Sequence, residues 1–155
     1  RVDNIEKKLA DHDKKFDLII KTGLPPHEGI FYDGQIFDAY LFATDIIKLA
    51  SESIILIDNY IDESVLILLS KRKINVDATI YTSSVSEQLK LDLRRHNEQY
   101  PTVTVKLFAR SHDRFIIIDH ETIYHLGASL KDLGKRWFAF SKINLDVKEI
   151  LDKLK

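Results

Sequence analysis

The stretch S-H-D-R-F-I-I-I-D, at residues 111–119, places a histidine, an arginine and a carboxylate on or beside one apolar strand. The imidazole of His112 can attack phosphorus or transfer a proton. The guanidinium of Arg114 can hold the non-bridging oxygens of a phosphate. The carboxylate of Asp119, where the strand ends, can orient either cation. Together the three side chains indicate a phosphate ester as the ligand or substrate.

The composition is that of one globular domain with a short appendage. The chain has 155 residues, of which 45% are apolar and 30% charged, so it can bury a sizeable core. Its formal net charge of -1 argues against a generally basic nucleic-acid coat, although a local basic patch is compatible with it. The absence of cysteine excludes disulfides and thiolate metal sites and fits a cytoplasmic protein.

Apolar runs and the start of the chain give two further expectations. No run approaches the roughly 20 apolar residues that a membrane-spanning helix needs, and the N-terminus does not resemble a signal peptide. We therefore expect no association with a membrane. The sequence contains no methionine, even at position 1, so we expect it to be part of a longer chain with a further N-terminal region.

Residues 1–23 differ from the rest of the sequence. Apolar side chains and one histidine recur there at spacings of three and four, with charged residues between them, as on an amphipathic helix or a short coiled coil. Such a stripe needs a partner surface, and Gly23, Pro25 and Pro26 end it. We expect a linker helix that helps two chains associate. The stripe consists of Val2, Ile5, Leu9, His12, Phe16 and Ile19.

Residues 29–155 alternate between helix and strand patterns. This order predicts an α/β domain with a mixed, mainly parallel sheet flanked by helices. The charged run Lys71-Arg72-Lys73 is expected to be an exposed helix end. Helices are expected at residues 36–50, 62–71, 86–99 and 146–154, and strands at residues 53–58, 75–81, 103–108, 115–118, 122–126 and 137–143.

Polar residues that follow the predicted strands supply further site candidates. In parallel sheets, ligands collect where the chain leaves the strand ends. Candidate companions for His112 are therefore expected after two of the strands. They are Asp58, Asn59, Tyr60 and Ser129.

A basic and aromatic stretch follows these candidates. Its aromatic residues, Trp137, Phe138 and Phe140, are expected in a core or an interface rather than as platforms for nucleic-acid bases. No metal site is expected, because the histidines outside the motif have only carboxylates near them in the sequence. The basic residues form either a groove for nucleic-acid phosphates or a solvated charged loop. They are Lys131, Lys135, Arg136 and Lys142.

The opening stretch resembles the HxKxxxxD motif of the phospholipase D superfamily, with His112, Arg114 and Asp119 at its three signature places. A G-S-x-N-like turn follows the motif in that superfamily, and Ser129, within L-G-A-S-L, occupies the place of its asparagine. The resemblance covers residues 31–143. This part of the chain also resembles the C-terminal domain of phage-type DNA-binding proteins, in which a helical linker joins it to an antirepressor-like N-terminal domain.

The resemblance implies a phosphodiesterase, in particular a nuclease-like one, that needs neither a metal nor a cofactor. His112 would attack phosphorus to form a phosphohistidine, a second histidine from another copy of the motif would protonate the leaving alcohol, and water would release the product. Because the chain has one copy, the resemblance implies a homodimer in which each chain contributes His112. DNA or another phosphodiester would be the substrate, and the preceding N-terminal region would bind DNA.

Departures from the superfamily pattern leave a second interpretation open. Arg114 replaces the usual lysine, Ser129 replaces the asparagine, and Lys135-Arg136-Trp137 stands where superfamily nucleases often carry an orienting carboxylate. Loss of an orienting group can cost orders of magnitude in rate. The alternative is a catalytically degenerate module of a DNA-binding regulator that binds phosphate or nucleic acid, or that dimerises. Substitutes for the missing carboxylate could be Glu28, Asp58, Glu121 or Asp132.

Overall fold

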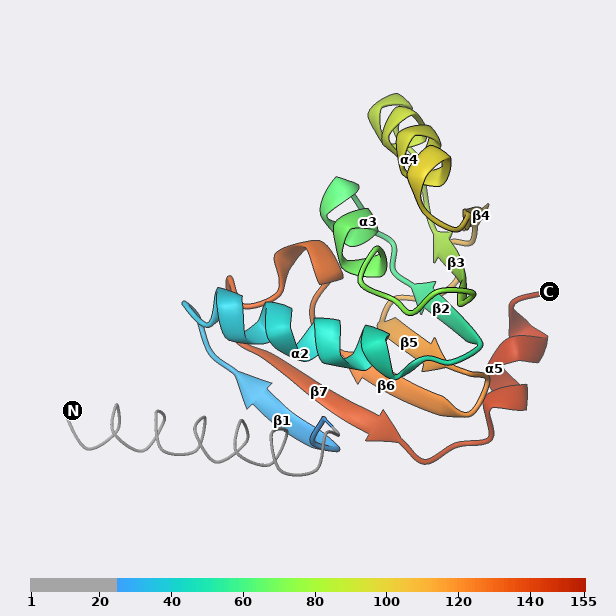
Figure 1. The fold of residues 1–155 in the computed structure, drawn as a ribbon. Coiled ribbons are helices and arrows are strands. Elements are labelled where there is room, and N and C mark those ends of the chain that lie inside the picture. Colours follow the sequence, from blue (N-terminus) through green and yellow to red (C-terminus); the bar gives the residue numbers. More distant parts are fainter. Residues whose placement is uncertain (1–24) are drawn as a thin grey trace, which may run out of the picture.

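The computed structural model describes residues 25–155, which form one seven-stranded sheet with helices against it (Figure 1). The linker helix predicted for residues 1–23 lies outside the described residues. None of the helices in this described part is long and apolar enough to cross a membrane. The strands are β1 (Glu28–Phe31), β2 (Ser53–Ile57), β3 (Asp77–Thr82), β4 (Val103–Leu107), β5 (Arg114–Ile118), β6 (Thr122–Leu126) and β7 (Phe138–Ile143). The helices are α2 (Ile36–Leu49), α3 (Glu63–Leu69), α4 (Glu87–Gln99) and α5 (Val147–Lys153), with a 3-10 turn η1 (Leu130–Asp132) between β6 and β7.

The sheet combines a parallel half with an antiparallel half. Its strand order is β1-β7-β6-β5-β2-β3-β4. β2, β3 and β4 pair in parallel, because α3 and α4 carry the chain back between them, whereas the other four pairings are antiparallel. The mixed α/β class is confirmed, but the prediction of a mainly parallel sheet is wrong. Three residues separate β5 from β6, too few for the crossover that a parallel pairing requires.

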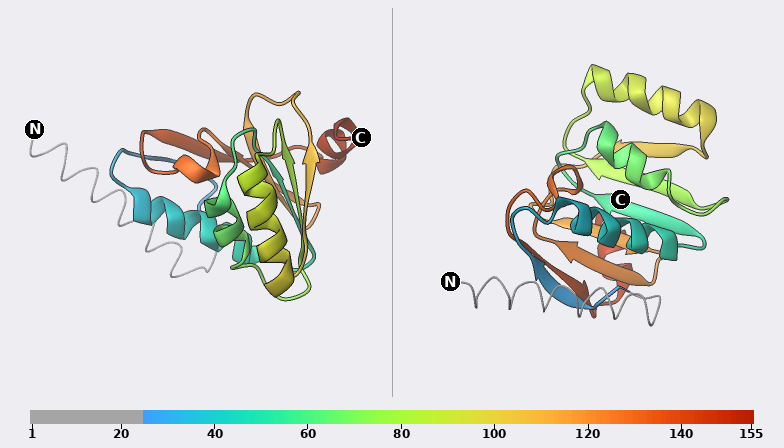
Figure 2. Two further views of the ribbon diagram at one scale, coloured as in Figure 1. Left: turned by 90° about the horizontal axis from the view of Figure 1, so that it is seen from above. Right: turned by 60° about the vertical axis from the view of Figure 1, so that its left-hand side comes forward.

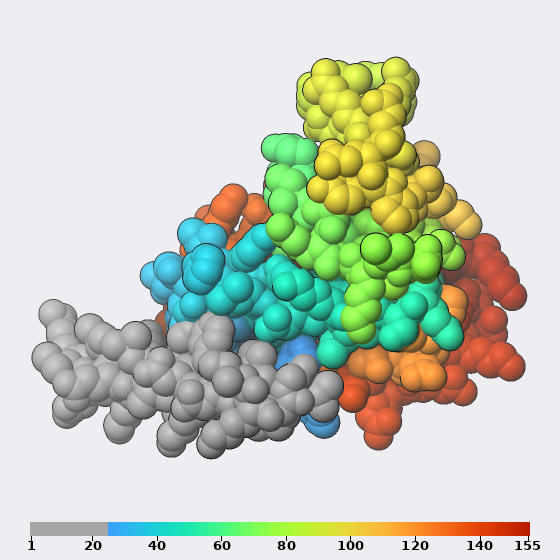
Figure 3. All heavy atoms as spheres, viewed as in Figure 1, coloured from blue at the N-terminus to red at the C-terminus, as the bar shows by residue number. Residues whose placement is uncertain are grey.

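Helices cover the two faces of the sheet unequally (Figure 2). α2, α3 and α4 lie over the larger cluster of buried side chains, and α5 packs on the opposite face over a smaller cluster around Ile117. α4 (yellow) projects from the body of the molecule and buries only Leu89 and His96 (Figure 3). Alternate residues of β2 and β5 point to opposite faces and are buried on both, so these two strands run through the centre of the core.

Phenylalanines fill the core on the α2 side of the antiparallel half. The Phe31 and Phe138 rings stack with centroids 5.2 Å apart, and the Phe42 and Phe140 rings lie 4.1 Å apart. All four side chains are buried, which confirms the core position predicted for Phe138 and Phe140. Trp137, just before β7, is instead 60% exposed. Successive residues of an extended strand point to opposite sides, so Phe138 and Phe140 enter the core while Trp137 stays outside.

Arg72 contradicts the expectation of an exposed charged helix end. It is buried, and its guanidinium donates hydrogen bonds to the carbonyl oxygens of Val76 from Nε (3.0 Å), of Leu69 from Nη1 (2.7 Å) and of Pro101 from Nη2. Burial lowers the pKa of Arg72, while the charge of Asp77 opposes that change. Arg72 therefore joins the end of α3 to the segment between α4 and β4.

Candidate functional site

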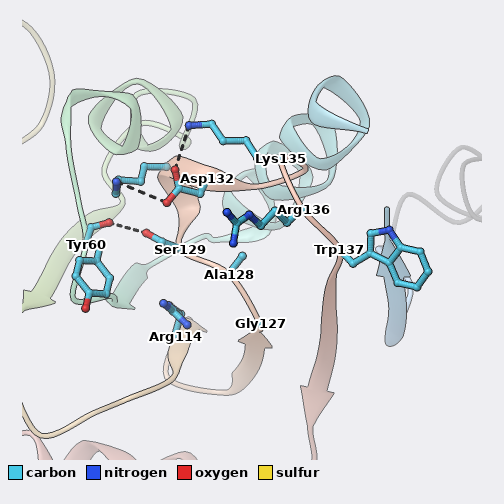
Figure 4. Close-up of a pocket in the computed structure, with 10 residues that line it drawn as sticks. Tyr60, Arg114, Gly127, Ala128, Ser129, Asp132, Lys135, Arg136 and Trp137 are labelled. Atoms are coloured by element: carbon cyan, nitrogen blue, oxygen red, sulfur yellow. Dashed lines mark hydrogen bonds and ion pairs between the residues drawn. The ribbon is translucent and has the colours of Figure 1, made fainter. Parts of the chain in front are cut away.

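A cavity of about 640 Å3 opens at the end of the sheet where β5 begins and β6 ends (Figure 4). We call it the basic pocket. Arg114 enters it from the first position of β5, Tyr60 from the loop after β2, and Ser129 from the connection between β6 and β7. The fold thus brings together predicted site residues that are far apart in the sequence. The pocket is lined by Tyr60, Arg114, Gly127, Ala128, Ser129, Lys131, Asp132, Lys135, Arg136 and Trp137.

Asp58 follows β2 and is fully buried next to the pocket wall. Both of its carboxylate oxygens lie 2.9 Å from the Ser129 Oγ, and the amides of Leu130 (2.9 Å) and Tyr60 (3.0 Å) donate to it. Burial raises the pKa of Asp58, and these hydrogen bonds and the charge of Arg114 oppose the rise. Ser129 Oγ also lies 2.5 Å from the Tyr60 carbonyl oxygen, so its one proton is shared between this oxygen and the Asp58 carboxylate. Asp58 and Ser129 therefore hold the pocket wall together.

Arg114 directs its guanidinium into the basic pocket (Figure 4). The side chain is half-buried, and its Cζ atom lies 6.0 Å from the centre of the Tyr60 ring, within the range of a cation–π contact. In the part of the chain that the structure describes, no carboxylate forms an ion pair with Arg114. Its positive charge can therefore meet an anionic ligand.

Further cations line the same pocket. The Nζ atoms of Lys131 and Lys135 lie 3.6 and 3.1 Å from carboxylate oxygens of Asp132. Partial burial acts to raise the pKa of Asp132, but the hydrogen bond from Lys135 and the charges of both lysines lower it on balance. Asp132 therefore offsets part of the positive charge, while Arg136 is exposed. Four cations face one carboxylate here, in a chain whose formal net charge is -1.

His112 lies outside the basic pocket. It is exposed, two residues before β5, and makes no hydrogen bond or ion pair with any other residue in the range 25–155. Its loop is held by Asn59, whose Nδ2 donates to the carbonyl oxygen of Ser111 at 2.7 Å. The adjacent carboxylate, on Asp113, lies 3.4 Å from the Nε2 of His125 instead. Among the described residues, His112 therefore has no orienting carboxylate.

Asp119 lies beyond the other end of β5, away from the basic pocket. Its carboxylate accepts hydrogen bonds from the amides of Ser51 (3.0 Å), Glu52 (2.7 Å) and Ser53 (3.1 Å). Partial burial acts to raise the pKa of Asp119, but these hydrogen bonds lower it on balance. Asp119 and His120 both have positive φ angles, of 55° and 56°. Asp119 thus joins the turn after β5 to the segment before β2, and the fold does not bring it together with the rest of its motif.

Two features of the pocket were not predicted. Trp137 lines the pocket, although a core or interface position was expected. The sequence signal for the pocket position is its spacing, because side chains alternate along a strand and Trp137 therefore points to the side opposite to Phe138 and Phe140. Gly134 has a φ of 81°, and a Cβ atom there would lie 2.6 Å from the Gln35 carbonyl oxygen. Only glycine lets this loop of the pocket approach the start of α2 so closely. No cluster of three His, Asp or Glu side chains suited to a metal ion occurs among residues 25–155.

Solved structures of other proteins share this architecture. No protein-family model and no curated protein matches the sequence. Nuc from Salmonella typhimurium, a phospholipase D family member, matches with a TM-score of 0.58 at 13% identity, over 81% of this chain and 90% of that one. NucT from Helicobacter pylori matches with a TM-score of 0.54 at 14% identity, over 82% of this chain and 90% of that one.

A third similar structure is that of TrmBL2, an archaeal chromatin protein with a novel mode of DNA binding. It matches with a TM-score of 0.53 at 14% identity, over 97% of this chain and 60% of that one. Likeness at these identities shows the fold alone. In this chain the predicted motif runs from the loop before β5, along β5, to Asp119 in the turn after it. The chain therefore has the fold of the phospholipase D superfamily.

Proposed function

We propose that this domain binds the phosphodiester backbone of nucleic acid in the basic pocket. The observation that carries the proposal is the convergence of four cations on one cavity, with Arg114 half-buried and without an ion pair among the described residues. A guanidinium in that position can hold two non-bridging phosphate oxygens at once. DNA binding by TrmBL2, which shares the fold, supports a nucleic acid as the source of the phosphates.

The contacts around the motif support binding more strongly than cleavage. The Ser129 hydroxyl, at the place of the superfamily's asparagine, is shared between Asp58 and the Tyr60 carbonyl. His112 is exposed outside the pocket and has no orienting carboxylate among residues 25–155. A histidine without such a partner is poorly placed for nucleophilic attack. These contacts therefore favour a domain that binds phosphodiesters without cleaving them.

A binding titration tests the proposal. The affinity of a fluorescent DNA oligonucleotide is measured by anisotropy between about 50 and 200 mM salt, and it should fall as salt rises, because binding releases counterions. Arg114→Gln and Arg136→Ala should each weaken binding several-fold and reduce the salt slope by about one. Lys148→Gln is the matched control, since it removes one exposed cation from α5, on the opposite face of the sheet. Equal affinities for the Arg114 variant and the control would refute the proposal.

Metal-independent cleavage by a homodimer is the second candidate. The observation that favours it is the exposed imidazole of His112, two residues from the pocket-lining Arg114, where a second chain could approach. A nitrogen of one His112 would attack phosphorus, and the P–O bond to the leaving oxygen would break as the partner's His112 donates a proton to it. Water would then attack phosphorus and give a proton to the partner's His112, and breakage of the P–N bond would restore the attacking histidine.

A nuclease assay in EDTA separates the two candidates. Wild type and His112→Ala are compared on DNA, RNA and a chromogenic diester, with sedimentation measuring the oligomeric state. His120→Asn is the control, because His120 is exposed at the far end of β5 and asparagine tolerates its positive φ. Activity that His112→Ala abolishes and His120→Asn retains would establish the enzyme. Equal activity in all three proteins, or none, would exclude it.

A further inference from the structure

Two large aromatic side chains are exposed on the wall of the basic pocket. Tyr60 is 59% exposed and Trp137 is 60% exposed. They come from the loop after β2 and from the residue before β7, and Figure 4 shows them on opposite sides of Arg114 and Arg136, with the Trp137 indole turned outward from the cavity. An exposed tryptophan leaves a large apolar area in water, so its position beside a cluster of cations calls for a ligand that uses both.

Both aromatic residues are held in place by neighbouring groups. The indole Nε1 of Trp137 donates to a carboxylate oxygen of Asp33 at 2.8 Å, and its ring meets the Tyr32 ring edge-on with centroids 4.7 Å apart. Tyr60 is anchored through its backbone, because its amide donates to Asp58 and its carbonyl oxygen accepts from Ser129. The Trp137 ring and the backbone that carries Tyr60 are therefore in place before a ligand arrives, which lowers the entropy lost on binding.

We propose that the basic pocket selects single-stranded over duplex nucleic acid, with bases stacking on Trp137 and Tyr60 and phosphates held by the cations between them. This inference deepens the proposed phosphodiester binding and rests on it. Bases in a duplex stack on one another and turn only their edges outward, so they cannot cover the face of a protein ring. Bases of a single strand can stack on aromatic side chains while a positively charged groove follows the backbone.

Trp137 is the only tryptophan of the sequence, which makes intrinsic fluorescence a local probe of the pocket. The protein is titrated with a mixed-sequence single-stranded DNA of about ten nucleotides, a length that matches known single-strand sites. The same sequence as a duplex is titrated at equal salt. We expect the single strand to change the tryptophan emission and to bind at least about tenfold more tightly than the duplex, because each stacked base adds to affinity.

Substitutions assign the effect to the rings. Trp137→Ala and Tyr60→Leu should each weaken single-strand binding about fivefold or more while leaving duplex binding nearly unchanged. Trp137→Phe keeps a ring and should lose less than the alanine variant. Tyr100→Leu is the matched control, since Tyr100 lies at the end of α4, outside the pocket. Circular dichroism confirms that each variant is folded.

The results of these experiments separate a failure of the single-strand inference from a failure of the proposed phosphodiester binding. Equal affinity for both forms of DNA, with unchanged tryptophan emission and with Arg114→Gln weakening both, would overturn the single-strand inference alone. If neither form binds at low salt, or if Arg114→Gln changes nothing, the proposed phosphodiester binding fails and this inference fails with it. Selective loss of single-strand binding in Trp137→Ala, against the Tyr100→Leu control, would support both.

Discussion

The two ends of the β2–β5 strand pair use the same residue type for different purposes. Because the strands are antiparallel, Asp58 after β2 and Asp119 after β5 lie at opposite ends of the pair. Each carboxylate accepts hydrogen bonds from backbone amides of a distant segment. Asp58 supports the wall of the basic pocket, whereas Asp119 ties a turn to the start of β2.

Burial distinguishes the two carboxylates. Asp58 is fully buried and its pKa is raised by that burial, while Asp119 is half-exposed and its pKa is lowered by hydrogen bonds that outweigh its partial burial. A buried carboxylate is costly to ionise, and each polar group bonded to it also loses contact with water. The pocket end of this strand pair therefore depends on its aspartate more strongly than the far end does.

The largest expected effect is at the pocket end. Asp58→Ala leaves the Ser129 hydroxyl and the amides of Leu130 and Tyr60 without their acceptor. We expect it to lower the free energy of unfolding by about 3 kcal/mol or more, because unsatisfied buried polar groups are individually expensive. Urea unfolding followed by circular dichroism measures this. A loss below about 1 kcal/mol would show that water reaches these groups.

A smaller loss is expected at the far end. Asp119→Ala removes the acceptor for the amides of Ser51, Glu52 and Ser53, but water can replace it because the site is partly exposed. We expect a loss of about 1–2 kcal/mol in the same unfolding experiment. If Asp119→Ala were less stable than Asp58→Ala, the far end would depend on its aspartate more strongly than the pocket end does.

The pH dependence of the two ends should differ in sign. Because the folded pKa of Asp58 is raised, its contribution to stability is full below the ordinary value of 3.8 and is lost as pH rises through the folded pKa. Because the folded pKa of Asp119 is lowered, its contribution is present above 3.8 and is lost as pH falls through the folded pKa. Falling pH should therefore increase the destabilisation caused by Asp58→Asn and decrease that caused by Asp119→Asn. Each of these changes should be smaller than the stability loss expected for the alanine variant at the same position. Urea unfolding between about pH 3 and 7 tests this, and parallel trends would contradict it.

The smallest expected effect concerns strain at the far end. Asp119 and His120 are the central residues of a turn closed by the hydrogen bond from the Glu121 amide to the Ile118 carbonyl oxygen at 3.0 Å, and both have positive φ. Such turns favour glycine at the second central position. His120→Gly should therefore stabilise the protein by about 0.5–1 kcal/mol, after the greater freedom of glycine in the unfolded chain is subtracted. Thermal unfolding measures this gain, and His120→Ala should show none.

Local signals predicted several elements of the fold. The helix predicted at residues 86–99 is confirmed as α4, whose first turn is capped by Ser86 Oγ accepting from the Leu89 amide at 3.0 Å. β1 was missed, because four residues that include a glycine show no pattern until they pair with β7. The buried position of Arg72 was also missed, since two of the carbonyl groups that it binds, on Val76 and Pro101, belong to other segments.

The candidate site also contains residues whose positions can be predicted from the sequence and residues whose positions depend on tertiary contacts. Tyr60, Arg114 and Ser129 could be predicted to meet, because the residues at one end of neighbouring strands converge whatever the direction of each strand. The length of β5 alone separates Asp119 from the pocket. Five steps of about 3.3 Å along β5 put Asp119 roughly 16 Å from Arg114, too far to share a ligand with it. The direction in which the His112 side chain projects from its loop depends on tertiary contacts, such as the hydrogen bond from Asn59 to the Ser111 carbonyl oxygen.

The position of β4 at the edge of the sheet has a consequence for solubility. Among the described residues no strand pairs with its outer side, so a row of backbone donors and acceptors can pair with another molecule. The strand reads V-T-V-K-L, rich in residues that favour β-aggregation, and Lys106 is its single charge. That ammonium group acts as a gatekeeper, and its repulsion between two approaching copies opposes the growth of an intermolecular sheet.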